Sequence, residues 1–448
     1  MHRLLFITLI TFFFFALMPK KFYAGDAYAI KLNAINFTQT GSLGIDYSNK
    51  KALYPLLENK GQYFFENDSK SKYFHRWGQL NTFLYAIPEL FHSTESFLID
   101  QNTVFRHGIF QSILFALFLC VFLRTLENLG FENKESYFYV TLVCVSTFTF
   151  QYIRVQSYEF FQLLFFTCFF SSLERYKNTG KSKYRFFLNL FFVLMVFTKS
   201  VLFLSCLFVI PYLGLKNIKR YWVETLTLLI CIGLYFFQQD YLYDSFFPIR
   251  TAHPANLDEV DFSLSFFSAR FKDYFIIPKR SLYTYFPLLI VAIIGLKEAF
   301  KKHSYEVQFL WASFFFLMLP NLFFHTYGDW CLGPRYILFI LPLLSFPAIY
   351  ALKKVKIKFV STTIGAIYFL FFLSFSVNDP HFVYRLSSLT QDTNYLNRNQ
   401  LLLSLDMLKT SEHPLLNRND PQQYGQGLIL LDQLHCDYYF DILCTTFE

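Results

Sequence analysis

The residues best suited to chemistry are acids at the ends of long apolar runs. Asp26 follows the first apolar segment within Gly25-Asp26-Ala27-Tyr28, and Glu159 precedes a later one. A carboxylate within hydrogen-bonding reach of a hydroxyl can accept its proton as the oxygen attacks a substrate. We therefore predict Asp26 as the catalytic base and Glu159 as the second catalytic carboxylate. The competing interpretations are a helix N-cap for Asp26 and stabilisation of a helix dipole for Glu159.

Cations, polar groups and one further acid occupy similar positions, and fixed cations favour a reaction that releases a phosphate. Lys199 lies between two apolar runs, and Arg335 begins another. The predicted substrate- and phosphate-binding residues are Arg335, Lys199, Arg76, His75, Arg154, Tyr336 and Asp329. Alternatively, the basic side chains reach toward lipid headgroups, Asp329 pairs only with Arg335, and His75 is a hydrogen-bonded surface residue.

The composition indicates the environment in which these residues act. Of 448 residues, 54% are hydrophobic and only 16% are charged, whereas a soluble domain carries about 25% charged residues. The apolar residues form long runs, which is typical of membrane spans. The net charge of +8 fits basic cytoplasmic loops and gives no indication of nucleic-acid binding.

The predicted fold is an all-α polytopic membrane protein with about eleven transmembrane helices, since a span needs about 20 apolar residues. Two features leave alternatives open. Segment 3–18 could instead be a signal peptide cleaved near Ala24. Segments 186–198 and 200–215 are either two short crossings or one crossing plus a re-entrant piece. The predicted spans are 3–18, 105–123, 137–153, 158–173, 186–198, 200–215, 222–237, 282–296, 307–324, 336–352 and 357–377.

Charge sets the expected orientation. With the N-terminus in the cytoplasm and every segment crossing, the basic stretches 175–185, 216–220, 297–302 and 353–358 all lie inside, as the positive-inside rule requires. This pattern favours two crossings within 186–215, with Lys199 at the outer surface.

The long polar stretches then share the outer face. They are the large first loop, 19–104, the loop 238–281, and the C-terminal region, 378–448, which contains a strand-like run at 427–432. The chain therefore divides into a membrane region, 1–377, and a small outer C-terminal region that ends outside the cytoplasm.

Five short segments, 25–32, 72–88, 154–159, 198–199 and 333–336, resemble those of the polytopic glycosyltransferases of the C-fold class. This class includes protein O-mannosyltransferases and the aminoarabinose transferases that modify lipid A. Two differences stand out: Ala27 occupies a position where the family commonly has a second acid, and Glu159 one where it often has Asp. The likeness extends over the membrane region.

The resemblance implies an inverting glycosyltransferase. Its donor would be a polyprenyl-phosphate sugar, and its acceptor a hydroxyl or amine on a lipid, glycan or protein. The active face would lie outside the cytoplasm, on the periplasmic side of the inner membrane. No cofactor is required, and a divalent cation is possible but not indicated. The eight Cys residues lack metal-ligand spacing, although Cys436 and Cys444 could form a disulfide in an oxidising compartment.

Other functional classes remain. A transporter or flippase for a lipid-linked sugar would use the same cationic outer face without a base, although transporters often contain inverted repeats and none is detected here. A surface-glycan ligase or polymerase would catalyse related chemistry on a different scaffold. A membrane subunit without catalysis is consistent with Ala27 in place of the second acid.

Overall fold

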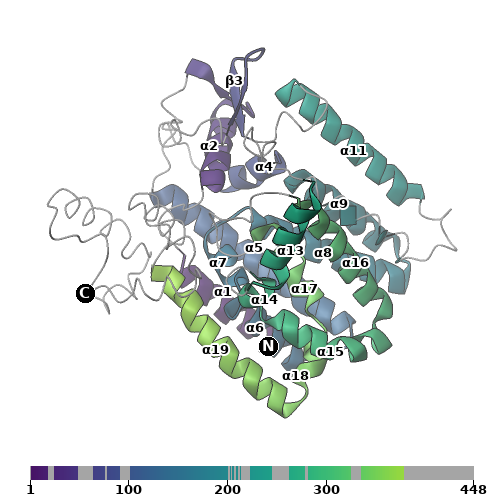
Figure 1. The fold of residues 1–448 in the computed structure, drawn as a ribbon. Coiled ribbons are helices and arrows are strands. Elements are labelled where there is room, and N and C mark those ends of the chain that lie inside the picture. Colours follow the sequence, from purple (N-terminus) through teal and green to yellow (C-terminus); the bar gives the residue numbers. More distant parts are fainter. Residues whose placement is uncertain are drawn as a thin grey trace, which may run out of the picture.

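The computed structural model consists mainly of helices, with one small sheet (Figure 1). It describes residues 2–18, 25–48, 64–75, 78–90, 101–199, 222–244, 262–277, 281–323 and 334–377, with single residues between 202 and 212. The predicted C-terminal region and its strand-like run at 427–432 lie outside the described residues, as do Cys436 and Cys444.

The N-terminal half contains the sheet and the helices packed around α8. Its elements are α1 (His2–Ala16), α2 (Gly25–Thr40), β1 (Ile45–Asp46), β2 (Phe64–Asn67), β3 (Lys72–His75), α4 (Leu80–Ala86), η2 (Ile87–Glu89), α5 (Gln101–Asn128), α6 (Asn133–Val145), α7 (Thr149–Arg154), α8 (Glu159–Thr179) and α9 (Ser182–Thr198).

The C-terminal half is helical throughout its described part. Its elements are α11 (Trp222–Tyr243), α13 (Leu264–Phe275), α14 (Leu282–Tyr285), α15 (Leu288–Lys302), α16 (Ser304–Asn321), η6 (Arg335–Ile337), α17 (Leu341–Leu344), α18 (Ala348–Leu352) and α19 (Val355–Val377).

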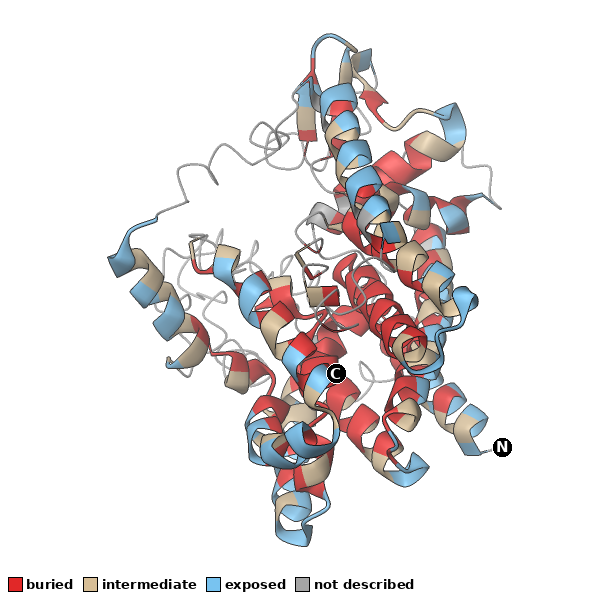
Figure 2. Ribbon diagram, turned by 90° about the vertical axis from the view of Figure 1, so that its right-hand side faces the viewer, coloured by how far each residue is buried: buried red, intermediate tan, exposed pale blue. Residues whose placement is uncertain are grey.

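Helix α8 is the centre of the bundle. Every residue from Glu159 to Glu174 is buried, which is typical of a helix enclosed on all sides. It packs against α5 and α9, and buried residues concentrate around it while the peripheral helices carry exposed faces (Figure 2). Aromatic rings join neighbouring helices: Phe14 of α1 lies 5.0 Å from Phe115 and 5.2 Å from Phe150, measured between ring centroids.

Several predicted spans are interrupted helices. Segment 137–153 divides into α6 and α7, and segment 282–296 divides at Phe286, which precedes Pro287 and is therefore disfavoured from helical geometry. These two interruptions contact each other, since the Phe148 amide donates to the Tyr285 carbonyl at 2.9 Å. Away from water, a broken helix is tolerated where the released backbone groups are paired within the protein.

A three-stranded antiparallel sheet, in the order β1-β3-β2, forms part of the first polar loop. Phe64 pairs with His75, and Ile45 pairs with Tyr73. The sheet lies beside α2 (Figure 1), and Asn67 joins it to α11 by donating to the Leu242 carbonyl at 2.8 Å. The described part of the chain is therefore mainly helical, as predicted, although the sequence pattern gave no indication of this sheet.

Three helices in the described part of the chain are long and apolar enough to cross a membrane, over Asn102–Asn128, Trp222–Leu242 and Val355–Leu373. Other predicted spans fall on shorter helices, such as α9 with 17 residues and α15 with 15. A straight perpendicular crossing takes about 20 residues. The structure thus supports a helical protein with candidate membrane spans.

Gly295 of α15 provides a test of the packing of α15 against α18. A Cβ atom at this position would lie 1.9 Å from the Pro347 carbonyl oxygen. We expect Gly295→Ala to lower the unfolding free energy by about 1–3 kcal/mol, because rigid backbone must move to admit the methyl group. The measurement is the thermal unfolding midpoint of the purified protein.

Gly233→Ala is the matched control. A Cβ there has nothing within 4 Å, so the higher helix propensity of alanine should leave the midpoint unchanged or raise it. Equal midpoints for both variants would contradict the close approach at Gly295.

Candidate functional site

The candidate site is organised by the turn between α7 and α8. Gln156 in this turn has a φ of 56°, a left-handed conformation that is uncommon for residues other than glycine. Two hydrogen bonds hold it: the Gln156 side chain donates to the Val104 carbonyl at 3.2 Å, and the Tyr85 hydroxyl donates to the Gln156 carbonyl at 2.7 Å. The turn thereby directs the chain into α8 at Glu159.

Glu159 is the first residue of α8, and both of its carboxylate oxygens accept hydrogen bonds. Arg335 Nη1 donates to Oε1 at 3.2 Å, and the Ser157 hydroxyl donates to Oε2. The side chains of Glu159 and Arg335 are only 3% and 12% exposed, so each charge depends on the other for compensation. The helix N-terminus adds favourable partial positive charge.

Tyr336 connects this ion pair to Lys199. Lys199 Nζ lies 4.4 Å from the centre of the Tyr336 ring, and Arg335 Cζ lies 5.2 Å from it. Lys199 directly follows α9, and its amide donates to the Met195 carbonyl at 3.1 Å. The structure therefore brings Glu159, Lys199, Arg335 and Tyr336 together from three distant parts of the sequence.

Arg154 ends α7, just before the same turn, but its guanidinium group contacts Gln151 and the end of α1. Its side chain is buried and donates to the Gln151 side chain at 3.0 and 3.3 Å, and to the Leu17 carbonyl at 3.4 Å. These contacts fasten α7 to the end of α1. Arg154 is thus enclosed by protein and does not extend to a surface, as the headgroup interpretation would require.

His75 lies in β3 and is fully buried beside the Thr82 hydroxyl. Burial lowers the pKa of His75 to about 3, so the ring is neutral at pH 7. The burial of His75 contradicts its interpretation as a hydrogen-bonded surface residue.

Asp26 is the second residue of α2. Its side chain lies outside the described residues, and so do Arg76 and Asp329. Their roles therefore remain predictions from the sequence.

A second group of ionisable residues, which the sequence analysis did not identify, lies in the interior. Glu89 is 1% exposed and contacts Arg106 Nη2 and His107 Nε2, each at 2.8 Å. Burial alone would raise the pKa of Glu89, but the hydrogen bonds and charges of His107 and Arg106 outweigh it and lower the pKa. Lys31 of α2 is buried nearby, and burial lowers its pKa well below the usual value despite the Glu89 carboxylate. The sequence feature that could have identified this group is the ionisable residue Glu89 within an apolar stretch.

Tyr85 links this group to the Glu159 turn. The Lys31 amine lies 5.0 Å from its ring centre, and the His107 and Phe161 rings lie 5.6 and 5.0 Å away. Burial, and secondarily the Glu159 carboxylate, raises the pKa of Tyr85 well above its usual value. Tyr85 therefore remains a phenol that donates to the Gln156 carbonyl.

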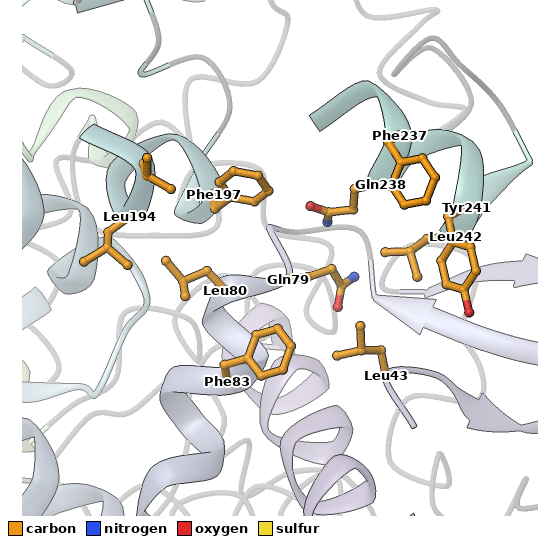
Figure 3. A pocket seen from close by; sticks show the side chains of 11 residues that line it. Leu43, Gln79, Leu80, Phe83, Leu194, Phe197, Phe237, Gln238, Tyr241 and Leu242 are labelled. Atoms are coloured by element: carbon orange, nitrogen blue, oxygen red, sulfur yellow. The ribbon is translucent and has the colours of Figure 1, made fainter. Parts of the chain in front are cut away.

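An apolar cavity of about 280 Å³ lies between α4, the C-terminal end of α9, and α11 (Figure 3). The side chains with polar atoms that line it are those of Gln79, Gln238 and Tyr241. Phe197, two residues before Lys199, is part of its wall, and Asn81 holds the end of α9 by donating to the Thr198 carbonyl at 3.2 Å. The wall of the cavity thus reaches a point two residues before Lys199 in the chain.

Comparisons with known proteins give no assignment, because no protein-family model and no curated protein match the chain. Within the described residues, no cluster of three or more His, Cys, Asp or Glu side chains is arranged to hold a metal ion.

Tyr85→Phe tests the link between Tyr85 and the Glu159 turn. Removing the hydroxyl leaves the buried Gln156 carbonyl without this donor, which should lower the unfolding free energy by about 1–3 kcal/mol. We also expect faster hydrogen–deuterium exchange at the amides of Phe160 and Phe161, which close the first turn of α8.

Tyr139→Phe is the control, because Tyr139 is equally buried and its hydroxyl donates to the Pro342 carbonyl at 2.7 Å, at the start of α17 and not in this turn. It should reduce stability without changing exchange at Phe160 and Phe161. Identical exchange in the two variants would show that Tyr85 does not hold the turn.

Proposed function

We propose that this protein is an inverting membrane glycosyltransferase. It transfers a sugar from a polyprenyl-phosphate donor to a hydroxyl or amine acceptor at the outer face of the membrane. The observation that carries the proposal is the buried Glu159–Arg335 ion pair, with Lys199 and Tyr336 beside it. Comparable ionisable groups in an apolar bundle are costly and are typically retained for function.

The proposed reaction is a single displacement. The acceptor oxygen or nitrogen attacks the anomeric carbon, and the bond from that carbon to the phosphate oxygen breaks. The electron pair of this bond leaves with the polyprenyl phosphate, while the acceptor proton passes to a carboxylate. Attack opposite the departing phosphate inverts the anomeric configuration.

The contacts of Glu159 suggest a division of roles between the two carboxylates. Because Glu159 is engaged by Arg335 and Ser157, it is suited to holding Arg335 in place. Asp26 is then the base that accepts the proton. Arg335 and Lys199 stabilise the charge that develops on the departing phosphate, since fixed cations in a water-poor site lower such barriers.

The apolar cavity at the C-terminal end of α9 fits the lipid portion of this donor. Its wall includes Leu80, Leu194 and Phe197, which suit an isoprenoid chain, while a phosphate attached to that chain would lie toward Lys199. A soluble nucleotide-sugar donor would have no use for such a surface. No cofactor is needed for the proposed transfer.

The proposal includes the finer topology of about eleven spans, with the N-terminus inside and the C-terminus outside the inner membrane. The basic stretches at 175–185, 297–302 and 353–358 support it. In this arrangement Glu159, Lys199 and Arg335 lie toward the periplasmic side.

Asp26→Asn tests the catalytic assignment. Transfer from polyprenyl-phosphate sugars to lipid and peptide acceptors should fall by about 100-fold to 10,000-fold, because the amide cannot accept the proton. Product is measured by mass spectrometry, and its anomeric configuration by NMR. Asp46→Asn is the control, since Asp46 belongs to the same loop and its partly exposed side chain pairs with Lys72 at 3.6 Å.

Equal transfer by wild type and Asp26→Asn would exclude Asp26 as the base. Retained configuration would exclude the single displacement. Movement of the lipid-linked sugar across vesicle membranes, without formation of product, would identify a transporter instead.

A reporter enzyme fused after Glu448 tests the orientation. A periplasmic reporter such as alkaline phosphatase should be active at this position, because an odd number of crossings places the two termini on opposite sides. A fusion after Lys302, in a basic stretch, is the control and should be inactive. Activity of a cytoplasmic reporter at Glu448 would contradict the proposed topology.

A further inference from the structure

A second cavity of about 300 Å³ lies between α6, α15 and α19, and it has no residue in common with the site around Glu159. Its walls are mainly aliphatic side chains, and several of these are also open to the surroundings: Ile290, Ile294, Val360 and Ile364 are 40–53% exposed. The cavity is therefore a groove on the outside of the bundle.

Polar groups occur at defined positions within this groove. Lys356 is exposed and lines one end. Ser361 also lines the groove and is only 8% exposed. Ser146, farther along, is 2% exposed, and its buried hydroxyl has no hydrogen-bond partner among the described residues. A buried hydroxyl normally has a partner, so the Ser146 hydroxyl points to a ligand with polar atoms.

The lysines around the end of the groove differ in their partners. Lys353 pairs with Glu135 at 2.8 Å, and Lys358 lies 5.0 Å from the Phe138 ring centre. Neither Lys354 nor Lys356 has a carboxylate partner among the described residues. Positive charge therefore remains available beside the first turn of α19, where the helix N-terminus also favours an anion.

The spacing along α19 matches the order of groups in a phospholipid. Ser361 lies five residues beyond Lys356, and Gly365 lies nine residues beyond it, which correspond to rises of about 7.5 and 13.5 Å. A phosphate at Lys356 would place the glycerol esters toward Ser361 and an acyl chain toward Gly365. At Gly365 the absence of a side chain keeps α19 close to Ser146, because a Cβ would lie 2.9 Å from the Ser146 hydroxyl oxygen.

We propose that this groove binds one anionic glycerophospholipid, with its phosphate at Lys356 and one acyl chain between α6, α15 and α19. Charge complementarity selects the occupant. A zwitterionic phospholipid would place a second cation beside Lys354 and Lys356, whereas an anionic headgroup such as phosphoglycerol adds none. Basic pockets between membrane helices bind acidic lipids in this manner.

The test measures lipid binding to the purified full-length chain in detergent. Phosphatidylglycerol should raise the thermal unfolding midpoint in proportion to its occupancy, and phosphatidylcholine should have little effect. Titration of each lipid gives its apparent affinity. An equal shift with both lipids would overturn the proposal, because the headgroup would then not be recognised.

Two variants locate the site. Lys356→Glu should weaken phosphatidylglycerol binding by about fivefold or more, since one basic residue near an acidic headgroup contributes about that factor and reversal adds repulsion. Val360→Trp should weaken it by filling the groove without altering charge. Lys181→Glu is the charge-matched control, because Lys181 is exposed at the start of α9 and does not line the groove.

Lys356→Gln replaces Lys356→Glu if the reversed charge prevents folding. Wild-type affinity in either Lys356 variant, or in Val360→Trp, would place the lipid elsewhere and overturn the proposal. If Lys181→Glu weakened phosphatidylglycerol binding as much as Lys356→Glu, the effect would come from the overall charge of the protein. That result would also overturn the proposal. None of these measurements depends on enzymatic activity.

Discussion

The ion pair between Glu159 and Arg335 is the interaction on which the candidate site depends. Both side chains are nearly enclosed, and an isolated charge in such surroundings would cost several kcal/mol. The pair therefore requires the first turn of α8 and the η6 segment to remain together, although they are 176 residues apart in the chain. Lys199 and Tyr336 then complete a compact cationic and aromatic group around it.

The surrounding structure supplies the rigidity that this pair needs. The unusual backbone at Gln156 persists because Tyr85 holds its carbonyl, and Tyr85 is itself packed against Lys31 and His107. Strained backbone conformations survive where neighbouring contacts determine them from several sides. Lys31 and His107, which lie near Glu89, thus help to hold Tyr85 in place, and Tyr85 in turn holds the backbone turn that precedes Glu159.

The apolar surroundings explain both the short helices and the two cavities. Where helices are interrupted, as near Phe148 and Phe286, the two breaks meet, and the Phe148 amide donates to the Tyr285 carbonyl. Irregular packing of this kind leaves spaces between helices. One such space lies at the C-terminal end of α9 and is proposed to hold the lipid of the donor, and the other is lined by Lys356 and is proposed to hold a membrane phospholipid.

The sequence by itself determined the helical class and the apolar character of the bundle, because composition and periodicity report burial. It also singled out Glu159, Lys199, Arg335 and Tyr336 as candidates for a site, because charges are conspicuous within apolar runs. It did not reveal the sheet, whose short strands depend on pairing between distant segments. Nor did it show that Arg154 and His75 are enclosed. Only the tertiary structure decided these features. The partner of a buried polar group is the residue that lies next to it in space, and the residues adjacent to it in the sequence do not identify that partner.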